Sequence, residues 1–141
     1  MNVFRNPQTV HAPLGAYTHQ AEITGAPRWL VLSGQIGIRT SGELPDDPIE
    51  QLGIALDNLT ANLNAVDMEL RDLVKLTVYF VGDVDLQLRR RRILDWLGET
   101  RPCMTVAQVV ALATPQLRVE IDAWACTDDP PRQKETSSRD R

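Results

Sequence analysis

The stretch that decides the fold is Val119-Glu120-Ile121-Asp122-Ala123-Trp124-Ala125, close to the end of the chain. Apolar residues alternate strictly with acidic or aromatic ones, which is typical of a β-strand with one face on a core. The carboxylates of Glu120 and Asp122 then point to the other face, toward solvent, a cavity or a partner. Strands disfavour acidic residues unless something satisfies them, so Glu120 is a candidate functional residue. A half-exposed edge strand with solvated acids is the alternative interpretation.

The part of the chain before this strand contains the residue patterns of further strands and of two helices. Asp47 followed by Pro48 is a typical helix start, and leucines at steps of three and four continue the helix to Val66. We expect strands over 17–24, 28–38, 73–81, 103–112 and 119–125, and helices over 48–66 and 84–97. This order, β-β-α-β-α-β-β, predicts an α+β fold in which one mixed sheet carries both helices on one face. The apolar run over 29–32 predicts a strand that is covered on both faces.

The composition suits one compact domain. The chain has 141 residues, of which 43% are hydrophobic, so it can bury a core without disulfides or metal ions. Its net charge of −4 argues against a nucleic-acid binder. No apolar run approaches membrane-spanning length, and we expect a cytoplasmic protein that contacts no membrane. We expect the domain to span 1–126, and we expect 127–141, which combines prolines and mixed charges, to be a disordered tail.

The cysteines and histidines do not predict a metal site. Cys103 and Cys126 form neither a C-x-x-C pair nor any other metal-ligand spacing, and His11 and His19 are the only histidines. The two cysteines suit a reduced compartment, with a single disulfide as the alternative.

Two further segments, Gly15-Ala16-Tyr17-Thr18 and Ser33-Gly34-Gln35, precede the last strand. With that strand and the spacing between them, they resemble the YjgF/RidA family of small trimeric proteins over roughly residues 11–126. The resemblance implies a chorismate-mutase-like fold and a homotrimer with three clefts between subunits, which bind a small molecule without a cofactor. A trimer would also cover the mixed apolar surface that Tyr79 and Trp124 leave open in a monomer.

The resemblance also implies roles for individual residues. Family members that hydrolyse imines and enamines of amino acids bind the substrate carboxylate with an arginine, while a glutamate assists the attack of water on the C=N carbon. Glu120 matches this catalytic glutamate, and Tyr17, Ser33 and Gly34 match residues that line the cleft. His19 is a candidate base at spacing two from Tyr17, and an interface histidine is the alternative.

The arginine is missing from this sequence. Met104 occupies its position two residues after Pro102, and together with Val106 it gives the expected ligand site an apolar floor. Arg101 lies three residues earlier, about 10 Å away along an extended strand, so it is a poor substitute. Losing a buried guanidinium–carboxylate contact costs about 2–5 kcal/mol. We therefore expect inefficient hydrolysis of small 2-iminoacids.

Three functions stay open. The first is an enzyme that adds water to an imine, enamine or related C–N compound, with Glu120 as general acid and base. The second is a trimer that binds a small metabolite without turnover. The third is RNA cleavage, which the acidic charge makes the weakest.

Two basic features also allow a functional interpretation. The run over 89–92 consists of four arginines and suggests phosphate binding, but we expect an ion-paired, solvated helix face that uses nearby aspartates such as Asp85. Lys75 has the setting of a Schiff-base lysine, although an interface lysine with its stem packed on neighbours is the preferred interpretation.

Overall fold

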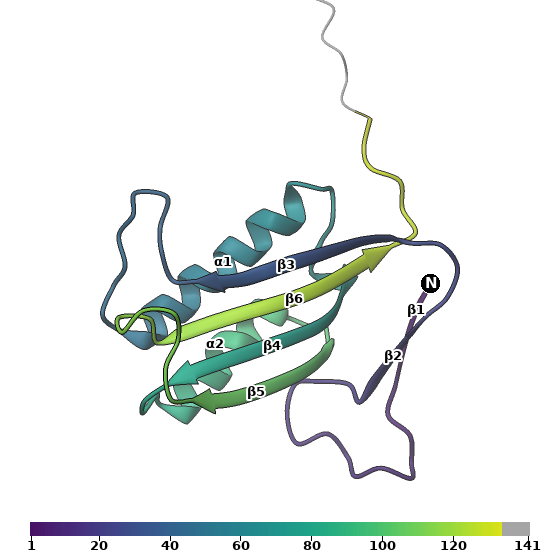
Figure 1. The fold of residues 1–141 in the computed structure, drawn as a ribbon. Helices are drawn as coiled ribbons and strands as arrows, with labels where there is room; N and C mark the ends of the chain where they lie inside the picture. The colour runs from purple at the N-terminus through teal and green to yellow at the C-terminus, as the bar shows by residue number, and fades with distance from the viewer. Residues whose placement is uncertain (134–141) are drawn as a thin grey trace, which may run out of the picture.

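The computed structural model describes residues 1–133 of the chain (Figure 1). Its elements, in chain order, are β1 (Asn2–Arg5), β2 (Gln20–Ile23), β3 (Arg28–Ile36), α1 (Pro48–Asn64), the 3-10 turn η1 (Leu70–Asp72), β4 (Leu73–Val81), α2 (Leu86–Leu97), β5 (Cys103–Val109) and β6 (Val119–Thr127). Both predicted helices and the four predicted strands from residue 28 onward are therefore confirmed, with small differences at their ends.

The main sheet has four strands in the order β3-β6-β4-β5. β6 is antiparallel to both of its neighbours, whereas β4 and β5 are parallel and are connected through α2. Figure 1 shows both helices behind this sheet, on one face. The predicted α+β class, with a mixed sheet and two helices on one side, is confirmed.

The expectation of a single sheet is wrong, because the N-terminal strands form a separate two-stranded sheet. β1 has no counterpart in the prediction, and it pairs antiparallel with β2. β2 begins only at Gln20, since the preceding segment is held at the start of β5, where the Thr18 amide donates to the Pro102 carbonyl at 3.1 Å. Gly25 has a φ of 87° and marks the left-handed turn at which the chain passes from one sheet to the other.

The core fills the space between the main sheet and the helices. Asp47 is the N-cap of α1, and its carboxylate accepts a hydrogen bond from the Ile49 amide at 3.1 Å. Burying each large aliphatic side chain stabilises the fold by about 1.5–3 kcal/mol. The core residues from α1 and the strands include Leu52, Leu56, Leu59, Leu63, Leu76, Val78, Phe80, Val119 and Ile121.

The face of the main sheet away from the helices, here called the open face, is not covered within one chain. Trp29, Val31 and Trp124 are 49%, 56% and 47% exposed. The predicted burial of 29–32 on both faces is therefore wrong for a single chain, since only Leu30 and Leu32 pack against the core. The rings of Trp29 and Trp124 meet edge to face with their centroids 6.1 Å apart.

β6 continues through Thr127, which is buried, so this residue belongs to the fold and not to a tail. Residues 128–133 have no regular structure, although the Arg132 amide donates to Asp67 Oδ2 at 3.0 Å. The rest of the segment that we expect to be disordered, residues 134–141, lies outside the described residues. Over residues 1–133, neither helix combines the length and the apolar character needed to cross a membrane.

Candidate functional site

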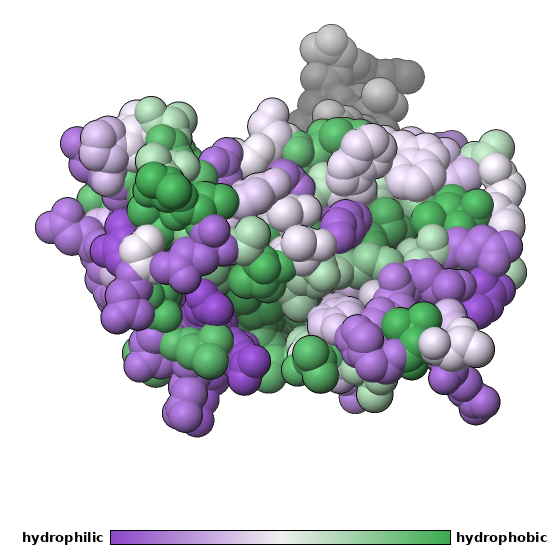
Figure 2. All heavy atoms as spheres, turned by 60° about the horizontal axis from the view of Figure 1, so that its bottom comes forward, coloured by the Kyte–Doolittle hydropathy of each residue, from purple (hydrophilic) through white to green (hydrophobic). Residues whose placement is uncertain are grey.

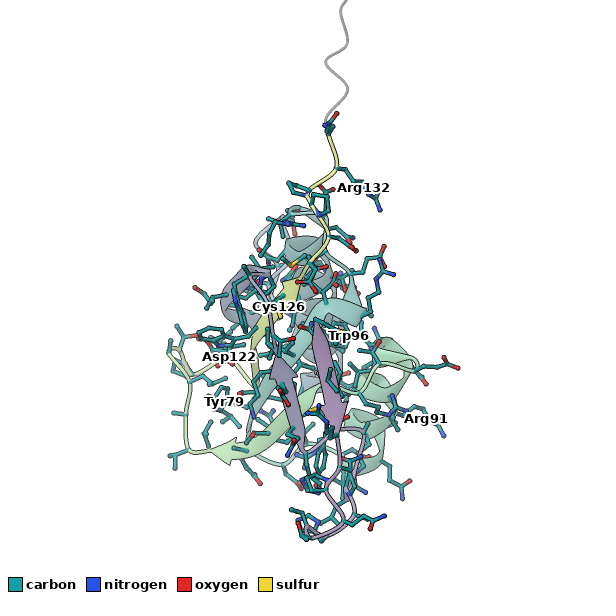
Figure 3. The ribbon with its side chains drawn as sticks, turned by 90° about the vertical axis from the view of Figure 1, so that its right-hand side faces the viewer. Tyr79, Arg91, Trp96, Asp122, Cys126 and Arg132 are labelled. Atoms are coloured by element: carbon teal, nitrogen blue, oxygen red, sulfur yellow. The ribbon has the colours of Figure 1, made fainter. Side chains whose placement is uncertain are left out.

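Glu120 lies on the open face, near the start of β6. Its register partners are Ile36 on β3 and Tyr79 on β4. Paired residues of antiparallel strands share a face, with Cβ atoms about 4.5–5.5 Å apart, so the side chain of Tyr79 lies beside that of Glu120. Figure 3 views the sheet edge-on and shows Tyr79 and Asp122 on the side opposite the helices. Tyr79 is a site candidate that sequence reasoning missed, because only the register between β4 and β6 places it beside Glu120.

A β-bulge in β3 brings Gly34 against Glu120. Between Leu32 and Gln35, β3 contains one residue more than the facing segment of β6. A Cβ atom on Gly34 would lie only 2.6 Å from Glu120 Cδ, far inside van der Waals contact. The Glu120 side chain therefore fills the space next to the Gly34 backbone, and a residue without a side chain is required there.

Ser33 is the other residue of the bulge, and it is exposed next to Gly34. Its carbonyl accepts a hydrogen bond from Gln35 Nε2 at 2.9 Å, and Gln35 Oε1 accepts one from Asn62 Nδ2 on α1 at 3.0 Å. These bonds connect the bulge to the helix layer. The structure thus brings together Ser33, Gly34 and Glu120, three of the predicted site residues.

Met104 and Val106 lie on the opposite side of the sheet from Glu120. They are the register partners of Leu76 and Val78, whose side chains are buried under the helices. With Ala16 and residues of α2, they line a hollow of about 100 Å³ between β5 and α2. Figure 2 brings the lower side of Figure 1 forward, where β5 lies, and shows hydrophobic side chains gathered in a recess between hydrophilic ones.

Tyr17 belongs to this second group. Its hydroxyl accepts a hydrogen bond from the Leu14 amide at 3.1 Å, and its ring meets that of His19 edge to face at 5.5 Å. Thr18 Oγ1 donates to the Arg101 carbonyl at 2.6 Å, which holds the segment at the start of β5. The neighbouring Ala16 lines the hollow beside Met104 and Val106.

The predicted site residues therefore form two groups on opposite sides of one sheet. Ser33, Gly34 and Glu120 lie at the bulge, whereas Tyr17 lies near the hollow formed by Met104 and Val106. A single chain does not bring Glu120 and Met104 together. A site that uses both groups requires a second copy of the chain.

Comparison with known proteins identifies relatives of this chain. A family model described as Endoribonuclease L-PSP matches residues 8–127. A RutC family protein from Buchnera aphidicola is 32% identical over 137 residues, which cover 89% of this chain and 98% of the relative. A RutC family protein from Pyrococcus horikoshii is 30% identical over 115 residues, which cover 80% and 88% respectively. The chain belongs to the YjgF/RidA family.

Solved structures of YjgF/RidA proteins share this fold. The crystal structure of YyfB from Yersinia pestis, described as a conserved Rid family protein of unknown function, matches with a TM-score of 0.79 and 27% identity, covering 89% of this chain and 98% of that chain. RidA from a Psychrobacter species has a TM-score of 0.66 at 23% identity, covering 89% and 99%, which supports the fold alone. The α+β architecture predicted from the strand and helix order is thus that of the family.

The arginine run of this YjgF/RidA protein is not the ion-paired face that we expected. Among the described residues, none of the four arginines at 89–92 has a carboxylate oxygen within 4.0 Å. Asp85, one of the expected partners, instead caps α2 by accepting a hydrogen bond from the Leu88 amide at 2.9 Å. The Arg89 guanidinium lies 4.7 Å from the centroid of the Phe80 ring, and both Arg89 and Arg90 line the hollow at Met104. The position of these two arginines beside Met104 is a second feature of the site that the sequence did not predict.

A larger cavity, of about 380 Å³, lies on the open face between β2 and the main sheet. Trp29, Trp124, Lys75 and Cys103 are among its lining residues. Lys75 Nζ donates to Thr105 Oγ1 at 2.7 Å, so a neighbouring strand holds the ammonium group. Burial raises the pKa of the Cys103 thiol, and the Lys75 charge opposes part of this rise. The raised pKa keeps the thiol protonated at neutral pH, which argues against Cys103 as a nucleophile.

Metal ligands do not gather in the part of the chain that the structure describes. Residues 1–133 contain no group of three or more His, Cys, Asp or Glu side chains placed to hold an ion. His19 Nε2 instead lies 2.6 Å from the His11 carbonyl oxygen, and the two rings meet edge to face. This contact gives His19 a structural role in the loop before β2.

Proposed function

We propose that this protein binds a small molecule with a C=N bond or a related C–N group and adds water to it, with Glu120 as general base and acid. The observation that carries the proposal is the close packing of Glu120 on Gly34 beside Tyr79, on a face that one chain leaves uncovered. This packing orients the carboxylate on a rigid strand, where a water molecule can reach it. Family membership supports a small-molecule function.

We propose that the working form is a homotrimer with clefts between its subunits. The exposed tryptophans of the open face favour a covered surface. The separation of Glu120 from Met104 within one chain also favours a site shared by two subunits, because neighbouring copies can supply one group each. Ser33 and Gly34 then line the cleft beside Glu120, while Tyr17, Met104 and Val106 line it from the adjacent subunit.

The proposed reaction needs no cofactor. Glu120 takes a proton from water as the water oxygen bonds to the C=N carbon, and bulk water supplies the proton that the imine nitrogen gains. The resulting carbinolamine loses its amine when the C–N bond breaks and a C=O bond forms. Glu120 gives its proton to the departing nitrogen while the hydroxyl proton passes to bulk water, so an imine of ammonia and one water yield a carbonyl compound and ammonia.

The proposed substrate preference follows from the apolar residues Met104 and Val106 of β5. By the family resemblance, Met104 occupies the position at which imine-hydrolysing relatives have an arginine. No residue of β5 is cationic. We propose that small 2-iminoacids, whose carboxylate adjoins the imine carbon, are poor substrates, and that larger or less anionic imines are better ones. The absence of an arginine on the strand costs such small substrates about 2–5 kcal/mol.

The direct test is ammonia release from freshly generated 2-iminopropionate and from larger imines, compared with the spontaneous rates. The proposal predicts little acceleration with 2-iminopropionate and a clear acceleration with a larger imine, which Glu120→Gln abolishes without a loss of ligand affinity. Strong acceleration with 2-iminopropionate contradicts the proposed preference. Turnover that survives Glu120→Gln contradicts the role of the carboxylate.

A trimer that binds a small metabolite without turnover is the second candidate. The hollow at Met104 and Val106 favours it, because its lining offers no general acid or base. Ligand binding with no turnover for any imine would support this candidate. RNA cleavage is not proposed, since a net charge of −4 does not favour a polyanion. The two free cysteines are consistent with a cytoplasmic location, which we include in the proposal.

A further inference from the structure

The hollow between α2 and β5 has an apolar lining, and two arginines are among its lining residues. Met104, Val106, Ile93 and Leu94 contribute the apolar lining, and Arg89 and Arg90 belong to the same wall. Two arginines of the neighbouring helix thus line the same hollow as Met104 of β5. Sequence spacing alone gives no sign of this, because these residues are separated from Met104 by more than a dozen positions.

The two arginines are held differently. Arg89 is half-buried, and its guanidinium lies over the Phe80 ring at 4.7 Å, a cation–π contact that fixes its direction. Arg90 is exposed, and the hydrogen bonds and ion pairs of residues 1–133 give its guanidinium no protein partner. Its five N–H donors are thus available to a ligand in the geometry that suits a carboxylate.

The other two arginines of the run provide a contrast. The Arg92 side chain packs against Gly53 of α1, where a Cβ atom would lie 3.0 Å from Nε. Arg91 is exposed, and Figure 3 shows it on the outer side of the helix layer, pointing away from the protein. Of the four arginines in the run, only Arg89 and Arg90 line the hollow at Met104.

We propose that Arg90, supported by the positive charge of Arg89, binds the carboxylate of a ligand whose apolar chain lies on Met104 and Val106. The ligand class is a small carboxylate with an aliphatic chain, because a bidentate guanidinium selects the acid group and the apolar lining selects the chain. This assignment rests on the proposed function and deepens it. Arg90 of α2, and not a residue of β5, binds the acid group. The preferred substrate therefore carries its carboxylate farther from the reacting carbon than a 2-iminoacid does.

The test uses the methyl resonances of the full-length protein labelled with [methyl-¹³C]methionine and titrated with butyrate. The chain has three methionines, and only Met104 lines the hollow. Met68 is 1% exposed in the core and Met1 is the N-terminal residue, so these two serve as internal controls. We expect butyrate to shift the Met104 methyl resonance in a saturable manner and to leave those of Met1 and Met68 in place.

Matched variants separate a specific site from general electrostatic attraction. We expect Arg90→Gln to weaken butyrate binding by about ten-fold, the loss of roughly 1.4 kcal/mol of a charged hydrogen bond. Arg90→Lys should restore part of the affinity, while Arg91→Gln, which removes the same charge on the outer surface, should leave it unchanged. Uncharged butyramide should bind weakly and should not respond to Arg90→Gln.

Two results overturn the assignment: no saturable shift of Met104 with butyrate, or equal weakening by Arg90→Gln and Arg91→Gln. Because the readout needs no turnover, it is independent of the reaction proposed for Glu120. Imine hydrolysis without butyrate binding at Met104 overturns the arginine assignment alone. Arg90-dependent butyrate binding without hydrolysis of any imine overturns the proposed reaction and leaves the carboxylate site standing.

Discussion

The Glu120 side chain occupies the space into which a side chain at Gly34 would project, with Cδ only 2.6 Å from the position of a Gly34 Cβ. The two residues come from neighbouring antiparallel strands, and the bulge in β3 makes the contact possible. A glycine and a glutamate that are far apart in the sequence thus form one structural unit. This unit fixes the direction of the carboxylate on the open face.

Gly34→Ala should lower the free energy of unfolding by about 1–3 kcal/mol, because the new methyl group and Glu120 cannot share the same space. Urea denaturation measures the loss. In the double variant with Glu120→Ala, the space is free again, and most of the loss caused by the alanine at 34 should disappear. Additive effects of the two substitutions would contradict the proposed packing.

Trp124→Glu should convert the proposed trimer into monomers. The indole is 47% exposed in one chain and pairs with Trp29, so a subunit interface on the open face would bury it, and a buried unpaired carboxylate is costly. Sedimentation velocity measures the change in mass. Ala61→Glu, an exposed position on α1, is the matched control and should leave the assembly intact. If wild-type protein sediments as a monomer, the trimer is excluded.

Alkylation of Cys103 should be slow at neutral pH and should accelerate at a pH above the ordinary range of a thiol. Burial raises the pKa of this thiol, so the reactive thiolate forms only at high pH. The Lys75 charge lowers the pKa, and its removal in Lys75→Met should therefore move the alkylation profile to still higher pH. Mass spectrometry of the Cys103 peptide after iodoacetamide treatment measures both profiles. A shift toward lower pH would contradict the assigned charge effect.

Asp47→Ala should destabilise the protein by about 1 kcal/mol, because the N-cap of α1 loses the acceptor for the Ile49 amide. Thermal or urea unfolding detects a change of this size. Asp46→Ala removes the same charge from the adjacent exposed position and serves as the control. Equal destabilisation by both substitutions would indicate a charge effect and not a capping bond.

Much of the candidate site could be predicted from local sequence. The alternation around Glu120 placed its carboxylate on the face away from the core, and the burial of β6 confirms that alternation. The cap at Asp47 and the leucine stripe of the first helix were likewise sufficient to predict α1, and the structure confirms both. These features depend on residues a few positions apart, which the periods of a strand and a helix relate directly.

The relation between the two halves of the site could not be predicted in this way. The motif placed Met104 in a common ligand site with Glu120, but the register between β4 and β5 turns Met104 toward the helices. β1 was missed because its four residues form a strand only through pairing with β2, some fifteen residues later. Arg90, Arg91 and Arg92 are exposed as expected, but the position of Arg89 and Arg90 at the hollow could not be predicted, because the helix period does not show which neighbouring strand a helix residue reaches.

The sequence by itself therefore determined the order of the two helices and the main-sheet strands, and the core faces of α1 and β6. These properties follow from side-chain chemistry and short-range periodicity. Only the tertiary structure decided that Glu120 and Met104 lie on opposite sides of the sheet, and that Arg89 and Arg90 share a hollow with Met104. The reason is that strand register and helix placement arise from long-range packing, which brings together residues with no local relation in the chain.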